Sequence, residues 1–283
     1  MGETRAPEPA GPEQPPPATP SLPPEAQRAT PPWPWPRAHR SFDPWAIWMH
    51  RAEELATART MGLPIPAWLR KTPGERRWPV TLTITVAIVL QMLLPSHLTR
   101  PLPQFLLPIL EAALGVALTF ANPFRIERGG PFVRAGSIAV IMLMSVFNAA
   151  SAVLLIKAIL EGTSAASATA LLATGASIWA TNVIAFALWY WEFDRGGPVL
   201  RAEGTRRHPD LMFPQMASPE LAPPDWEPRF VDYLYLSFTN ATAFSPTDVM
   251  PLARWAKLTM AVQSGVSLAI GALVIARAIN ILK

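Results

Sequence analysis

Apolar residues dominate the chain after Trp78, in runs too long for the core of a soluble domain. The hydrocarbon core of a bilayer is about 30 Å thick, which requires roughly 20 apolar residues in a helix. The runs that meet or nearly meet this length are 80–94 with an extension to Leu98, 104–122, 135–160, 164–191 and 255–282. The pattern predicts an all-α, polytopic transmembrane helical bundle with five spans.

A shorter segment, 230–244, mixes apolar and polar residues before the last of these runs. It is too short for an ordinary span. Two alternatives stay open for it: a short polar sixth span, or a re-entrant element that returns to the side it entered. The chain then divides into a disordered Pro-rich tail (1–42), an amphipathic juxtamembrane segment (43–77), two transmembrane hairpins (78–192), a cytoplasmic connection (193–228), and a pore-like segment with the final span (229–283).

The first 77 residues hold 17 of the 33 prolines. Because proline lacks an amide proton and fixes φ, residues 1–42 are predicted to be disordered with polyproline II character. Such a tail is either a docking ligand for an aromatic-lined groove or a spacer. Asp43 and Pro44 are then typical of a helix start. Trp45 and Trp48 share one face of this helix, which indicates either the bilayer interface or packing against the protein's own membrane domain.

Lysine and arginine alternate between the loops of the predicted bundle, and an excess of these residues marks cytoplasmic loops. Only Arg100 lies between the first and second spans, and only Lys157 lies near the connection of the third and fourth. The basic loops hold Arg70, Lys71, Arg76 and Arg77 before the first span, Arg125, Arg128 and Arg134 before the third, and Arg195, Arg201, Arg206 and Arg207 after the fourth. This bias predicts a multi-pass protein of the cell inner (plasma) membrane with its N-terminus in the cytoplasm.

A short motif occurs twice, each time after an even-numbered span. Residues 127–135 read Glu-Arg-Gly-Gly-Pro-Phe-Val-Arg-Ala, and residues 194–202 read Asp-Arg-Gly-Gly-Pro-Val-Leu-Arg-Ala. The similarity favours a duplicated helical hairpin, as in transporters with parallel repeats. The alternative is one stop signal used twice. In either case Gly-Gly-Pro ends a helix, and the flanking arginines are expected at the lipid headgroups.

Polar residues inside the apolar runs are candidate functional groups. Glu111 lies behind Pro108 in the second span, and Lys157 is its expected partner, as a proton or cation relay or as a structural ion pair. Asn148 and Asn182, near the middles of the third and fourth spans, are expected to bond to each other as interhelical glue or to bind a substrate.

Some chemistry is absent from the sequence. The chain has no cysteine, its four histidines make no metal-binding spacing, and no phosphate loop or nucleophile elbow is found. An enzyme, a cofactor and a metal site are therefore not predicted. The net charge of +4 is modest, so nucleic acid is not an expected partner. The expected partner is the lipid bilayer.

Residues 235–251 resemble the pore region of two-helix potassium channels, where an aromatic helix ends in Thr-x-Gly-Tyr-Gly-Asp. The positions that match this pattern are Ser237, Phe238, Thr242, Asp248 and Pro251. Ser245, Pro246 and Thr247 replace the filter glycines and tyrosine, and the fixed φ of Pro246 excludes a potassium filter. The resemblance therefore implies a degenerate pore-like site formed by Thr239, Asn240, Thr242, Ser245, Thr247 and Asp248.

Residues 191–198 and 237–257 also resemble an uncharacterised family of bacterial multi-pass inner-membrane proteins, which implies no particular activity. The function predicted from the pore-like site is permeation of ions or small solutes. The alternative is a non-transporting membrane scaffold or interaction protein whose tail recruits partners. A pore with one such segment per chain requires a homo-oligomer around an axis, whereas a monomer favours the scaffold.

Overall fold

The computed structural model describes residues 66–98, 103, 105–121, 124–126, 130–163, 167–206, 208–218, 221–243 and 248–282, which all belong to one compact unit, Glu54–Lys283. The predictions for the Pro-rich tail and for the helix starting at Asp43 lie outside these residues. So do Ser245, Pro246 and Thr247 of the pore-like site. The described part of the chain is helical, apart from one pair of two-residue strands, so the all-α class is confirmed.

The longer helices are α2 (Trp78–Met92), α3 (Leu106–Ala121), α4 (Pro131–Leu160), α5 (Ala168–Phe193), α8 (Phe230–Ala243) and α9 (Arg254–Leu282). The short elements are η1 (Ala67–Leu69), η2 (Ser96–Leu98), η3 (Asp194–Gly196), α6 (Pro198–Ala202), β1 (Leu211–Met212), α7 (Pro214–Ala217) and β2 (Met250–Pro251).

Three of these helices are long and apolar enough to cross a membrane: α4, α5 with its continuation to Gly196, and α9. The helices α2 and α3 are apolar but have only 15 and 16 residues. At 1.5 Å per residue each is about 22–24 Å long, less than the hydrocarbon core of about 30 Å. The prediction of five full-length spans is therefore not supported. Pro95 follows the end of α2, and α3 does not begin until Leu106.

The helix ends follow from local sequence. Ser167 caps α5, and its hydroxyl accepts a hydrogen bond from the Ala170 amide at 3.2 Å. After α5 the chain turns at Arg195, Gly196 and Gly197, all with positive φ. Both Gly-Gly-Pro motifs also start a helix, because Pro131 is the first residue of α4 and Pro198 the first of α6. The second motif also follows directly on the end of α5, as the predicted stop requires, whereas α3 ends at Ala121, before the first motif.

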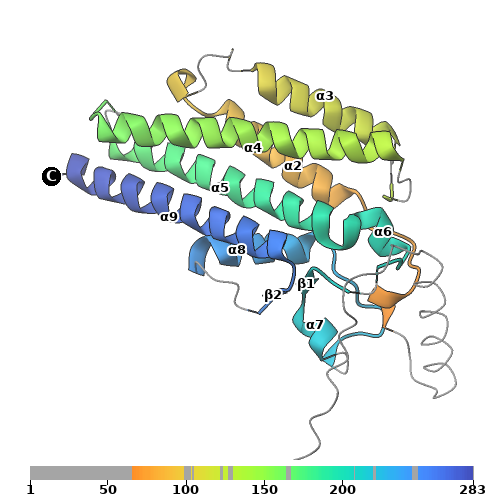
Figure 1. Cartoon of the computed structure of the whole chain (residues 1–283). Helices are drawn as coiled ribbons and strands as arrows, with labels where there is room; N and C mark the ends of the chain where they lie inside the picture. The colour runs from red at the N-terminus through yellow and green to blue at the C-terminus, as the bar shows by residue number, and fades with distance from the viewer. Residues whose placement is uncertain are drawn as a thin grey trace, which may run out of the picture. The chain divides into compact units, whose positions relative to one another are not determined.

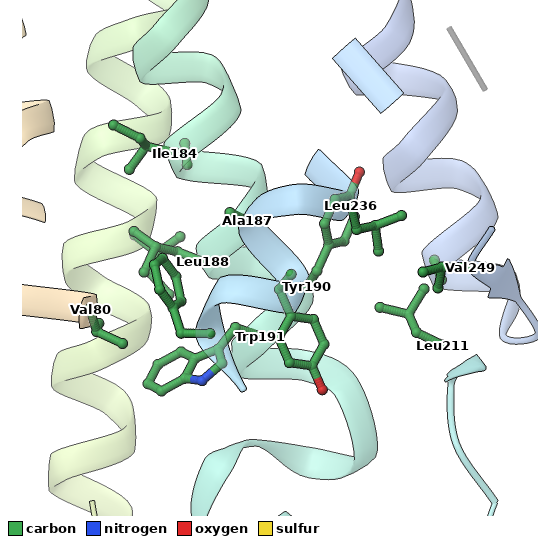
Figure 2. Close-up of a cluster of buried hydrophobic side chains, with 14 of the residues drawn as sticks. Val80, Ile184, Ala187, Leu188, Tyr190, Trp191, Leu211, Leu236 and Val249 are labelled. Atoms are coloured by element: carbon green, nitrogen blue, oxygen red, sulfur yellow. The ribbon is translucent and has the colours of Figure 1, made fainter. Parts of the chain in front are cut away.

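The helix α5 is at the centre of the bundle and packs against α2, α4, α8 and α9. Figure 1 shows α4, α5 and α9 running side by side, with α3 beyond α4 and α8 along the other side of the layer. A large apolar cluster surrounds the C-terminal half of α5 and includes Leu188, Tyr190 and Trp191 (Figure 2). A second cluster joins α4, α5 and α9 towards the other end.

The helix α8 runs antiparallel to α5. Phe230 at its start lies against Trp191 with ring centroids 6.0 Å apart, and Phe238 lies 6.0 Å from Trp179 near the middle of α5. The chain then returns: β2 pairs with β1, which follows the end of α5. At the start of α9, Trp255 packs 5.5 Å from Phe193. The chain thus enters and leaves this segment at the same end of the bundle.

Gly175 of α5 lies in close contact with α9, so we expect Gly175→Ala to be destabilising. A Cβ atom there would lie 2.8 Å from both Cγ atoms of Val274, whose branched side chain has little freedom to move. We expect the free energy of unfolding in detergent to fall by about 1–3 kcal/mol. Gly265→Ala is the control, because no atom lies within 4 Å of the added Cβ. Equal losses in the two variants would contradict this packing.

Candidate functional site

The side chain of Gln263 is the centre of a buried hydrogen-bond network between α5, α8 and α9. Its Oε1 accepts hydrogen bonds from the Tyr190 hydroxyl at 2.7 Å and from the Asn240 amide at 2.8 Å. Its Nε2 donates to the hydroxyl of Ser237 at 2.7 Å and to the Ser237 carbonyl at 2.9 Å. The amide group of Gln263 therefore has a partner for each donor and acceptor position.

Asn240 and Ser237 extend this network to the backbone of the neighbouring helices. Asn240 donates to the carbonyl of Met260 on α9 at 3.0 Å, and Ser237 donates to the carbonyl of Val183 on α5 at 2.6 Å. The hydroxyl of Ser264 donates to the carbonyl and Oδ1 of Asn240, each at 3.2 Å. We call this set the Gln263 network: Ser237, Asn240, Gln263, Ser264 and Tyr190.

The described residues of the predicted pore-like site differ in burial and in hydrogen bonding. Asn240 is buried in the Gln263 network, whereas Thr242 and Asp248 are exposed. The hydroxyls of Thr239 and Thr242 donate to carbonyls one turn earlier in α8 itself. Of the predicted pore-like residues on α8, Asn240 is the one whose described side-chain hydrogen bonds reach another helix.

A second buried polar cluster lies where α5 ends, and it centres on Asp194. The Oδ1 atom of Asp194 accepts hydrogen bonds from the backbone amides of Asp210 and Leu211 at 3.1 and 3.3 Å. Its Oδ2 accepts from the Tyr233 hydroxyl at 2.6 Å and lies 3.5 Å from Nε of Arg195. This carboxylate thus joins the end of α5, the connection before β1, and α8.

The arginines of the second Gly-Gly-Pro motif are buried, which corrects the prediction that they lie at the lipid headgroups. Arg195 donates to the carbonyl of Trp68 at 2.7 Å, and Arg201 donates to the carbonyl of Asp194 at 2.9 Å. The guanidinium of Arg201 also lies 5.0 Å from the ring centre of Tyr233. Sequence reasoning missed this role, because backbone acceptors supplied by distant segments leave no pattern around an arginine.

Glu75, which precedes α2, completes the same end of the bundle. Its two carboxylate oxygens accept hydrogen bonds from the indole of Trp191, at 2.8 Å, and from the backbone amide of Phe230. Burial raises the pKa of the Glu75 carboxyl, although both hydrogen bonds and the charge of Arg201 act in the opposite direction. Glu75 therefore ties the segment before α2 to α5 and to the first residue of α8.

The predicted pairing of Glu111 with Lys157 is absent from the described contacts. Lys157 lies 3.7 Å from Glu161, one turn later on α4, and both side chains are exposed. Glu111 is fully buried beside Gln91 of α2. The prediction assumed that two residues near the same membrane surface would meet. The side chain of Lys157 is instead exposed, whereas Glu111 is buried.

Asn148 and Asn182 line one cavity of about 390 Å³ between α4, α5 and α9. The predicted hydrogen bond between them is not among the described contacts. The amide of Asn182 instead donates to the hydroxyl of Ser267 on α9 at 3.2 Å, and no described residue donates to Oδ1 of Asn148. Asn182 thus acts as interhelical glue, with a different partner.

The described residues contain no group of three or more histidine, aspartate or glutamate side chains positioned to hold a metal ion. Comparison with protein-family models, with curated proteins and with solved structures finds no match for this chain. The two resemblances drawn from the sequence are therefore not tested by these comparisons.

Replacing Gln263 tests whether its network fixes α8. Gln263→Leu keeps the approximate volume but leaves Ser237, Asn240 and Tyr190 each without one partner. We expect a loss of about 2–4 kcal/mol in the free energy of unfolding in detergent, because unsatisfied buried polar groups are costly. Ser264→Ala removes only two hydrogen bonds of 3.2 Å and is the control, with a loss of about 1 kcal/mol or less. A smaller loss in Gln263→Leu than in the control would contradict this assignment.

Proposed function

We propose that this chain is a multi-pass protein of the inner (plasma) membrane, in which α8 and the residues after it form a re-entrant element for permeation of cations or small solutes. The observation that carries the proposal is the path of the chain around α8, which enters the bundle and returns to the same end. With 14 residues, α8 is about 21 Å long and extends only part of the way along α5.

The arrangement of charges supports a threading in which five helices cross: α2, α3, α4, α5 and α9. The short helices α2 and α3 fit a bilayer that thins locally around them. The arginine bias puts the end that holds Glu75, Asp194 and the start of α8 in the cytoplasm. In this threading α8 inserts from the cytoplasmic side, unlike the pore loop of potassium channels, and needs no crossing of its own.

The position of the C-terminal end of α8 supports an interaction with cations. The carbonyl groups at the C-terminus of a helix carry a partial negative charge. Here they come after the level at which Phe238 meets Trp179, near the middle of α5. In membrane proteins, backbone that leaves a helix at membrane depth is tolerated where protein buries it or where it lines a water-filled path. We therefore assign permeation to Thr242, Ser245, Thr247 and Asp248, and a positioning role to Asn240.

One observation favours the alternative of a non-transporting scaffold. The Gln263 network is satisfied within a single chain, so Asn240 and Ser237 are not left open to a solute. A bundle of this kind is stable without a conducting path. The two functions are separated by flux and by oligomeric state, because a pore with one re-entrant element per chain requires several copies.

Cysteine labelling distinguishes a re-entrant element from a sixth span. The chain has no cysteine, and Leu221, Leu252 and Leu282 are exposed. We expect Leu221→Cys and Leu252→Cys to react with an impermeant reagent from the cytoplasmic side, and Leu282→Cys from the opposite side. Reaction of positions 221 and 252 from opposite sides would show that α8 crosses the membrane. Reaction of both from outside would reverse the threading.

Cation flux tests permeation directly. In reconstituted vesicles we expect Asp248→Asn to reduce potassium, sodium or proton flux by about tenfold, because a carboxylate at a mouth raises the local cation concentration. Asp225→Asn removes an exposed carboxylate from the connection before α8 and serves as the control. If neither the wild type nor Asp248→Asn conducts any of these ions, the permeation hypothesis is wrong and the scaffold function replaces it.

A further inference from the structure

A basic groove of about 780 Å³ lies between the start of α2 and the end of α3. Three arginines line it, Arg76, Arg77 and Arg125. None of the described residues that line the groove is an aspartate or a glutamate. The described residues of the groove therefore provide no carboxylate to balance the positive charge of the three arginines.

Backbone pairing brings the three arginines together. Arg76 and Arg125 face each other in an antiparallel bridge between the segment before α2 and the segment after α3. On either side, the amide of Arg77 donates to the carbonyl of Phe124 at 3.1 Å, and the amide of Ile126 donates to that of Glu75 at 3.0 Å. Like charges directly opposite each other are unfavourable, so an anion between them offsets a repulsion that the fold imposes.

Arg77 is the residue that points to a ligand. Its side chain is largely buried, with a relative exposure of 9%, and no described residue accepts a hydrogen bond from its buried Nε. Arg125, by contrast, donates to the carbonyl of Gly74 at 2.9 Å. A buried charge is unfavourable unless it is paired. Arg77 lines the groove and also a second cavity, whose lining includes Glu192 and Glu203, and its buried Nε is a donor without a described acceptor.

The rest of the groove is suited to a lipid. Trp78 and Phe124 line it with relative exposures of 62% and 84%, as is typical of aromatic residues at a bilayer interface. Leu82, one turn further along α2, is also exposed and continues the lining towards the middle of the helix. The groove therefore offers guanidinium groups at one end and apolar side chains next to them.

We propose that this groove binds the phosphate headgroup of an anionic phospholipid, with its acyl chains lying along α2 beyond Leu82. Guanidinium groups form paired hydrogen bonds with phosphate oxygens, and basic pockets between helices on the cytoplasmic side recognise anionic headgroups. The proposal rests on the membrane placement given above, because that placement puts the groove in the cytoplasmic leaflet. It does not rest on permeation.

The test is a lipid titration of the full chain purified in a neutral detergent. Thermal unfolding is followed by tryptophan fluorescence while phosphatidylglycerol or phosphatidylcholine with the same acyl chains is added. We expect phosphatidylglycerol to raise the unfolding temperature at a concentration at least about tenfold lower than phosphatidylcholine. Arg76→Gln, at an exposed position, should reduce this preference about fivefold. Replacing Arg76, Arg77 and Arg125 together by glutamine should abolish it.

A matched variant separates this groove from general charge attraction. Replacing Arg206, Arg229 and Arg254 by glutamine removes the same charge from exposed positions elsewhere, and should keep the preference. If the triple groove variant does not fold, the test depends on Arg76→Gln, and an unchanged preference for phosphatidylglycerol in that variant would contradict the proposal. Equal response of the wild type to both lipids, or equal loss in the matched variant, would overturn the proposal. An equal shift with inorganic phosphate would also overturn it, since the site would then take a free anion.

The outcome is independent of the other tests. Absence of ion flux leaves the lipid preference unaffected, and a reversed threading moves the lipid to the other leaflet without changing a titration in detergent. A chain that stays monomeric in buffer without detergent contradicts the membrane placement itself. A missing lipid preference in a detergent-dependent chain contradicts only the groove.

Discussion

The buried carboxylate of Asp194 holds the end of the bundle on which the path of α8 depends. It is placed where α5 stops, and it accepts hydrogen bonds from two backbone amides of the following connection and from Tyr233 of α8. A buried charge costs least when it is paired and hydrogen-bonded, and Asp194 has these donors and lies 3.5 Å from Nε of Arg195. Once these bonds form, the start of α8 must lie beside the end of α5.

The position of α8 follows from this constraint together with the Gln263 network. Asp194 and Glu75 hold the first residues of α8, and Gln263 holds its second half through Ser237 and Asn240. A helix of this length cannot shield its polar groups alone in an apolar medium, where unsatisfied groups are costly. Its polar side chains instead find partners on α5 and α9, so α8 is anchored at both ends.

The same interactions divide the polar residues of the chain into two classes. Most polar groups of the Gln263 and Asp194 clusters have hydrogen-bond partners in the protein and position α8, although Nε of Arg195 and Nη2 of Arg201 have no described hydrogen-bond partner. Other buried polar atoms have no described partner, including Oδ1 of Asn148 and Nε of Arg77. Buried polar groups of this second kind are uncommon, and each is a place where a ligand, ion or water is expected. The basic groove at Arg77 is the one where neighbouring charge and shape indicate the ligand.

Hydrophobic patterning was enough to locate the three long helices, because a long apolar run is a local property of the sequence: α4, α5 and α9 lie where the sequence predicts them. The lengths of α2 and α3, the return of the chain after α8, and the partners of Asn182 and Lys157 were not predictable in this way. The sequence pattern also predicted that Arg195 and Arg201 lie at the lipid headgroups, although both are buried and donate to backbone carbonyls. These features were decided by the tertiary structure, because a polar side chain's partner comes from a segment distant in sequence. Hydropathy records how much a residue avoids water, but not which donor or acceptor packing brings to it.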